Sequence, residues 1–140
     1  METGEQGVEE FARRLTFSVL IGNGDMHLKN WSILYKDGKT PTLSPAYDLV
    51  STIPYIPTDE LALKFGGSKS LHEITEDQVR KFCATARIPE RTITQAISTT
   101  IERSTEAWKK LDVKDMLTKG FRGKIGRHIE TVAANSGSIR

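Results

Sequence analysis

An acid and an amide five positions apart, Asp25 and Asn30, are the residues whose types and spacing point most directly to chemistry. In enzymes that transfer a phosphoryl group from ATP, an Asp at the first position accepts or orients the proton of the attacking hydroxyl. An Asn at the second position helps to hold a magnesium ion on the phosphates. The bare spacing is common by chance, so the neighbouring residues must decide whether it has this meaning.

A predicted hairpin follows this loop and leads to a second acid. Residues 31–35 (WSILY) predict a strand, an Asp-Gly pair predicts a tight turn, and residues 40–44 (TPTLS) predict the returning segment. Pro41 cannot donate to a ladder, so the second strand is expected to lie at an edge or to be irregular. We expect the hairpin to bring Asp48 back beside Asn30. Two oxygen ligands would then reach one magnesium ion, whose remaining ligands are typically phosphate and water.

The run GNGDMHLKNWSILY, followed by LSPAYDLVS, resembles the C-terminal lobe of HipA-like serine/threonine kinases, the toxin components of bacterial toxin–antitoxin pairs. By position, the resemblance implies that Asp25 is the catalytic acid. It implies that Asn30 and Asp48 bind magnesium and, through it, the ATP co-substrate. His27 and Lys29 match the His and Lys of the family loop and are further catalytic candidates. The expected fold is a mainly α (α+β), protein-kinase-like C-terminal lobe, a helical bundle whose small β-hairpin carries the active-site loop.

The same resemblance implies a domain organisation and partners. Residues 1–140 are expected to form one HipA-like kinase C-terminal domain, with the catalytic loop and hairpin at 21–51 and a helical remainder at 71–134. Its substrate would be a protein, by family analogy an aminoacyl-tRNA synthetase. A helix-turn-helix antitoxin would be a partner, and DNA would be contacted only indirectly. Neither a glycine-rich loop nor a strand lysine paired with a helix glutamate precedes Asp25, so we expect the N-lobe to be absent and this chain alone to be inactive.

Several alternatives remain open at the level of sequence. The chain is also compatible with a truncated, non-catalytic module that binds an antitoxin or a partner lobe. Phosphoinositide-type lipid kinases share a similar D-x-H-x-x-N loop. His27 suits a general base, a zinc ligand, or a structural role through bonds to the backbone or to Asp48. Lys29 suits either neutralisation of the transferring phosphoryl group or a solvent-facing position. Trp31 suits a nucleotide pocket or an anchor for its strand.

The elements that must position these residues are mostly helical. Apolar residues recur at helical spacing from about 6 to 20, which predicts an amphipathic helix ending at the glycines of GNG. A capping-box pattern at 75–78 (TEDQ) predicts a second helix that buries Cys83 in the core. Pro89 is expected in the first turn of a third helix, whose apolar stripe is expected to include Leu111, and a fourth helix is expected within 113–134.

Less regular structure is expected between the hairpin and the second helix. Two prolines within residues 50–57 indicate an irregular, extended stretch, which we interpret as a substrate-facing loop. Residues 61–65 predict a short strand or helix. The run GGSKS at 66–70 suits a plain turn better than phosphate binding, because it lacks the spacing of a P-loop.

Composition limits the remaining possibilities. The chain of 140 residues is 37% hydrophobic and 27% charged, which is typical of one soluble globular domain. Its single cysteine excludes an internal disulfide and a multi-cysteine zinc site. No apolar run approaches the roughly 20 residues of a membrane span, and the polar start is unlike a secretory signal. We therefore expect a cytoplasmic protein without a membrane partner.

Basic residues are concentrated near the C-terminus. Residues 109–127 hold seven Lys or Arg and two Asp, although the formal charge of the whole chain is only +2. Such a segment suits contact with DNA, tRNA or an acidic partner, or else a solvated helix face.

Overall fold

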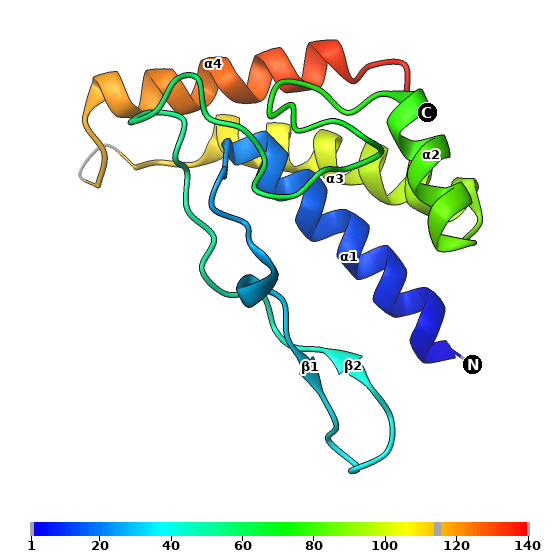
Figure 1. Ribbon diagram of the computed structural model, residues 1–140. Helices are drawn as coiled ribbons and strands as arrows, with labels where there is room; N and C mark the ends of the chain where they lie inside the picture. The colour runs from blue at the N-terminus through cyan, green and yellow to red at the C-terminus, as the bar shows by residue number, and fades with distance from the viewer. Residues whose placement is uncertain (1, 114–115, 140) are drawn as a thin grey trace.

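Four helices and one small hairpin form the fold within residues 2–113 and 116–139, which the computed structural model describes (Figure 1). The helices are α1 (Glu2–Ile21), α2 (Glu76–Ala86), α3 (Glu90–Lys110) and α4 (Lys119–Asn135). Helix α1 packs against α3 and α4, and α3 also packs against α2 and α4. The predicted fold class, mainly helical with a small β-hairpin, is confirmed.

Helix α1 delivers the chain to the loop that carries Asp25. Its inward face is apolar and buried, and comprises Ala12, Leu15, Val19 and Leu20. At its end, the Gly22 N–H donates to Val19 O (3.1 Å) and the Asn23 N–H donates to Ser18 O (2.8 Å), the paired bonds of a Schellman motif. Gly22 has φ +66°, and a Cβ there would lie 2.7 Å from the Ile53 side chain. Glycine is therefore needed to turn the chain out of the helix at this point.

The hairpin projects away from the helices (Figure 1). Its antiparallel strands are β1 (Ile33–Leu34) and β2 (Thr42–Leu43), with Ile33 opposite Leu43. They are shorter than the predicted segments 31–35 and 40–44. The register would place Pro41 opposite Tyr35, and because Pro41 has no N–H to donate, the ladder stops there. At the base of the hairpin, the Trp31 ring lies 4.8 Å from that of Phe11 in α1, so Trp31 anchors the hairpin to the helical core.

Local capping explains where the later helices begin. The capping box predicted before α2 is confirmed: the Gln78 N–H donates to Thr75 Oγ1 (3.2 Å), and the Thr75 N–H donates to Gln78 Oε1 (2.8 Å). Pro89 is the N-cap of α3, one position before the predicted first turn. Helix α4 starts after Thr118, whose hydroxyl accepts from the Phe121 N–H (3.3 Å). Each predicted helix is therefore present, with its ends moved by a few residues.

The prediction of a strand or helix at 61–65 is wrong. This segment follows an irregular path that closes in a turn, where Phe65 and Ser68 exchange backbone hydrogen bonds of 2.8 and 3.0 Å. Gly66 and Gly67 form the centre of that turn with positive φ angles. The glycine turn reverses the chain before a ladder or helix can form.

Two side-chain predictions for the helices have different outcomes. Cys83 is 2% exposed in the core, where burial raises the pKa of its thiol, so its predicted packing role is confirmed. Leu111 was expected on the apolar stripe of α3, but it caps the end of that helix and remains 48% exposed.

The basic segment is partly used by the fold. Lys124 Nζ donates to Pro54 O (3.0 Å), and the Arg122 guanidinium donates to Leu111 O (2.8 Å). Lys114 and Asp115, which belong to the same predicted segment, lie outside the described residues. Among the described helices, none combines the length and the apolar character that crossing a bilayer requires.

Candidate functional site

The loop between α1 and the 3₁₀ turn η1 (Leu28–Asn30) holds Asp25 on a fixed backbone. Asn23 is fully buried, and its Oδ1 accepts from the Asp25 N–H (3.0 Å). On the other side of Asp25, the Met26 side chain is also buried. The Asp25 side chain itself is 49% exposed. A carboxylate that is open to solvent on an anchored backbone can reach the hydroxyl of a bound substrate.

His27 is placed against Asp25. Its Nε2 lies 3.0 Å from Asp25 Oδ1, and both side chains are about half exposed. A structural role was one of the alternatives from sequence, but the partner is Asp25 instead of Asp48 or a backbone group. The zinc alternative lacks a ligand set, because no group of three His, Cys, Asp or Glu suited to a metal occurs in the described part of the chain. His27 is thus positioned to orient the Asp25 carboxylate.

Asn30 and Asp48 meet across the base of the hairpin, as the order of elements predicted. Asn30 Nδ2 donates to Asp48 Oδ2 at 2.8 Å. Asn30 is 8% exposed, at the end of η1. Asp48 has φ +56°, in the left-handed region, where Asp and Asn are tolerated better than most other residues. This local conformation belongs to the turn that brings Asp48 to Asn30.

Tyr47 fixes the segment that carries Asp48. Its hydroxyl donates to Lys29 O (2.8 Å) and lies 2.6 Å from Ser32 Oγ. Because Lys29 belongs to η1 and Ser32 precedes β1, the chain after the hairpin is tied to the chain before it. The Lys29 side chain is exposed, which leaves its ammonium group accessible to an anion.

The Asn30–Asp48 pair fits a magnesium ion. Asn30 Oδ1 is buried and has no hydrogen-bond partner among the described residues. An unpaired buried acceptor is costly, and a cation next to the Asp48 carboxylate would satisfy it. A cavity of about 10 Å³, roughly the room needed by one water, is bordered by Asn30, Asp48 and Trp31. Amide and carboxylate oxygens are ligands that Mg²⁺ prefers.

Comparison with known families assigns this chain. The model of the HipA-like C-terminal domain matches residues 1–108, which cover most of the chain. The chain belongs to this family. The matched region of the HipA-like domain contains α1, the loop with Asp25, the hairpin, α2 and nearly all of α3.

Relatives of the HipA-like domain are considerably longer than this chain. "Putative kinase Y4dM" of Sinorhizobium fredii is 48% identical over 110 residues, which are 78% of this chain and 27% of the relative. "Putative kinase Y4mE" of the same organism is 29% identical over 127 residues, which are 89% of this chain and 30% of the relative. The chain therefore spans less than a third of the length of these curated relatives.

A solved structure shares the fold. It is HipA of the Shewanella oneidensis MR-1 toxin–antitoxin system, in the complex of HipA, HipB and operator DNA. The TM-score is 0.73 at 20% sequence identity, and the match covers 94% of this chain and 33% of that chain. At this identity the similarity shows that the two domains have the same fold.

Two residues of the HipA-like domain that the sequence did not single out, Thr52 and Asp59, hold the Asp25 loop. The Gly24 N–H donates to Thr52 Oγ1 (2.8 Å), and the Thr52 N–H donates to Gly22 O (2.8 Å). The Thr52 hydroxyl also bonds the Asp59 carboxylate. A Cβ on Gly24 would clash with that carboxylate, so Asp59 lies directly against the loop. Thr52 and Asp59 are therefore positioning residues.

His128 supports the same loop from α4. It is 6% exposed, and its Nε2 lies 2.9 Å from Val19 O near the end of α1. Burial lowers the pKa of His128, and the nearby His72, whose ring lies 5.4 Å away, lowers it further, although the bond to Val19 acts in the opposite direction. A backbone hydrogen bond to Leu71 also raises this pKa, and Nε2 can donate a proton to the Val19 carbonyl. No sequence spacing signals this contact, because the two residues are 109 positions apart.

Proposed function

We propose that this HipA-like domain supplies the hydroxyl-orienting acid and the magnesium ligands of a serine/threonine protein kinase. The kinase would transfer the γ-phosphoryl group of ATP to a protein hydroxyl. The observation that carries the proposal is the buried Asn30 side chain, which donates to Asp48 (2.8 Å) and has an Oδ1 without a partner among the described residues. The kinase names of the relatives Y4dM and Y4mE agree with this chemistry.

Each side chain then has a role in phosphoryl transfer. The half-exposed Asp25 carboxylate accepts a hydrogen bond from the substrate hydroxyl and orients it towards the phosphorus atom. His27, at 3.0 Å from Asp25, restricts the carboxylate to one orientation. Asn30 and Asp48 would hold magnesium, which neutralises charge on the phosphates. The exposed Lys29 ammonium is available to the transferring group.

The activity is proposed for a protein in which this domain is joined to a nucleotide-binding lobe. No glycine-rich loop or strand lysine of the kinase type lies in residues 1–24, and the chain spans less than a third of its relatives. We therefore expect the 140-residue chain alone to bind ATP weakly.

The test is phosphoryl transfer from γ-labelled ATP in such a longer protein. Asp25→Ala should lower the rate by about 10²- to 10⁴-fold, because the hydroxyl loses its proton acceptor. The control is Glu130→Ala, at an exposed acid of α4. An unchanged rate in Asp25→Ala would refute the assignment. Transfer to phosphoinositide vesicles instead of protein would identify a lipid kinase.

A partner is proposed on separate grounds. The structurally similar HipA of Shewanella oneidensis was solved with HipB and operator DNA. For the whole protein, we propose an antitoxin partner of the HipB type. DNA would be contacted through that partner. Co-expression with the protein encoded beside its gene, followed by size-exclusion chromatography, tests this.

For the substrate, an aminoacyl-tRNA synthetase is the first protein to assay.

A further inference from the structure

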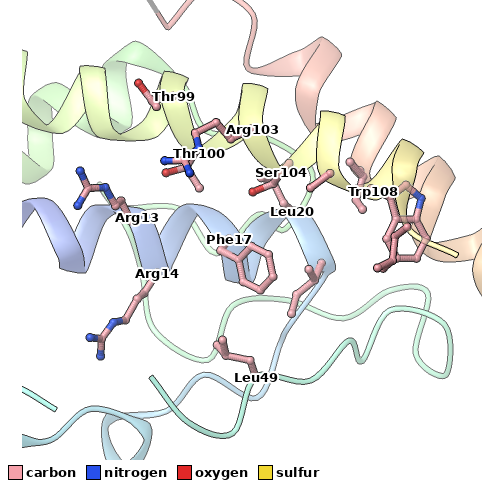
Figure 2. Close-up of a pocket in the computed structure, with 14 residues that line it drawn as sticks. Arg13, Arg14, Phe17, Leu20, Leu49, Thr99, Thr100, Arg103, Ser104 and Trp108 are labelled. Atoms are coloured by element: carbon pink, nitrogen blue, oxygen red, sulfur yellow. The ribbon is translucent and has the colours of Figure 1, made fainter. Parts of the chain in front are cut away.

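A groove of about 570 Å³ lies between α1 and α3 (Figure 2). Apolar side chains from α1, from α3 and its C-cap, from α4 and from the loop after Asp48 line most of it: Phe17, Leu20, Leu49, Trp108, Leu111 and Ile129. Its volume is within the range of sites that bind ligands. Leu49 and Leu111 are 41% and 48% exposed, so the groove is open along one edge. An open apolar edge suits a chain that continues beyond the groove better than an enclosed small molecule.

The polar wall of the groove carries an uncompensated positive charge. Arg13 and Arg14 also line it, but both are ion-paired with glutamates one turn earlier in α1. Arg103 forms no ion pair with any residue that the structure describes. Thr99 and Ser104 add hydroxyl groups near Arg103 (Figure 2). The groove therefore presents one available guanidinium, which can bind a carboxylate, beside an apolar floor.

A second guanidinium, that of Arg122, does not line the groove but lies beside one of its lining residues. The Arg122 guanidinium lies 5.5 Å from the centre of the Trp108 ring and donates to Leu111 O (2.8 Å). Trp108 is half-buried, and its ring forms part of the lining. Arg103 supplies the available positive charge of the lining, and Arg122 adds positive charge beside Trp108, so acidic groups are favoured and basic groups are disfavoured.

The groove adjoins the candidate magnesium site. Arg14 and Leu49 line both the groove and the small cavity beside Asn30 and Asp48. A segment seated in the groove would therefore lie next to the residues that are proposed to bind magnesium.

We propose that this groove binds an acidic, amphipathic segment of a protein partner. A carboxylate of that segment pairs with Arg103, and a large apolar side chain packs against Phe17 and Trp108. Binding of this kind does not depend on phosphoryl transfer, so it can be tested on the 140-residue chain whatever the outcome of the kinase assay.

Fluorescence anisotropy with labelled peptides of about 12 residues tests the proposal. Each peptide has Glu spaced three or four residues from Leu, Phe or Trp, and matched peptides carry Gln or Lys in place of Glu. The Glu series should bind best. Arg103→Glu should weaken its binding by about tenfold or more, and the Lys series should bind Arg103→Glu better than the unmodified chain. Arg91→Glu, an exposed position of α3 outside the groove, is the charge control.

A second variant tests the apolar part. Ala107 is exposed and lines the groove, so Ala107→Trp should fill it and abolish binding, whereas Ala134→Trp on exposed α4 surface should not. Thermal melting of each variant checks the fold.

Three outcomes would overturn the proposal. The first is peptide binding that is absent, or that is unchanged by both Arg103→Glu and Ala107→Trp. The second is self-association of the chain that Ala107→Trp abolishes, which would assign the groove to a second copy. The third is binding of dodecanoate at the groove without binding of any peptide, which would identify a site for small organic anions.

Discussion

The backbone of the Asp25 loop is held by contacts that leave no room for a side chain at Gly24. Its N–H donates to Thr52 Oγ1 (2.8 Å), and the Asp59 carboxylate lies where a Cβ would be. These contacts act on the residue directly before Asp25. The direction in which the Asp25 carboxylate points therefore depends on two residues that are remote in sequence.

Gly24→Ala should be destabilising. The new methyl group must displace Asp59, which also bonds Thr52, and overpacking of this kind costs about 1–3 kcal/mol in the free energy of unfolding. Urea denaturation of the chain measures the loss. Gly120→Ala is the matched control, because a Cβ there meets no atom within 4 Å in the first turn of α4, and it should be neutral or stabilising. Equal stabilities for the two variants would contradict this account of the loop.

At the scale of elements, the hairpin depends on its turn. Asp37 Oδ1 accepts from the N–H groups of Lys39 (2.9 Å) and Thr40 (2.7 Å), and Oδ2 accepts from the Thr40 hydroxyl (2.6 Å). The Thr40 hydroxyl and the two N–H groups lower the pKa of Asp37 from 3.8 to about 2. These bonds compensate for strands of only two residues.

The depressed pKa of Asp37 predicts how the hairpin responds to acid. Its contribution should be complete above pH 3.8 and be lost as the pH falls through about 2, because the ionised carboxylate is the hydrogen-bonded form. An NMR titration of the Asp37 carboxyl carbon measures the midpoint. Thr40→Val removes the hydroxyl donor and should move the midpoint towards 3.8. A midpoint near 3.8 in the unmodified chain would show that the turn lacks these bonds in solution.

The contact of α4 with the end of α1 predicts a second pH dependence. The folded-state pKa of His128 lies below the ordinary 6.5, so the unfolded chain binds the proton first as the pH falls. The free energy of unfolding should therefore be undiminished above pH 6.5 and should decline below it until the folded-state pKa is passed. Melting temperatures between about pH 7.5 and 5.5 measure this slope. The slope should be nearly lost in His128→Gln and only partly reduced in His72→Gln, because burial is the larger cause of the shift. Equal slopes in all three proteins would contradict the role of His128.

For the whole molecule, the parts that the sequence predicted are those encoded locally. Asp25, Asn30 and Asp48 lie within 24 residues on one loop and one hairpin, so the order of elements predicted that Asn30 and Asp48 would meet, as they do. The start of α2 could likewise be predicted from the sequence, because a capping box needs only four consecutive residues. Features that depend on a few neighbouring residues leave a pattern in the sequence.

The parts that the sequence did not predict depend on the path of the chain in three dimensions. Thr52 reaches Gly24 across 28 positions and His128 reaches Val19 across 109, and neither separation produces a periodic or motif-like signal. The same holds for the groove, where Arg103 is available because it forms no ion pair with any residue that the structure describes. The turn after Phe65 was predicted correctly, but the segment 61–65 before it was wrongly expected to be a strand or a helix.

The central claim is that Asn30 and Asp48 form a magnesium site beside Asp25. Paramagnetic broadening by Mn²⁺, a spectroscopic substitute for Mg²⁺, tests it in the NMR spectrum of the nitrogen-labelled chain. The account predicts broadening that is centred on the Asn30 side-chain amide and on Asp48, is reversed by excess Mg²⁺, and is weakened about tenfold or more in Asp48→Asn. Asp77→Asn, at an exposed acid of α2, should leave it unchanged. Broadening that is absent from Asn30, or unaffected by Asp48→Asn, would contradict the account.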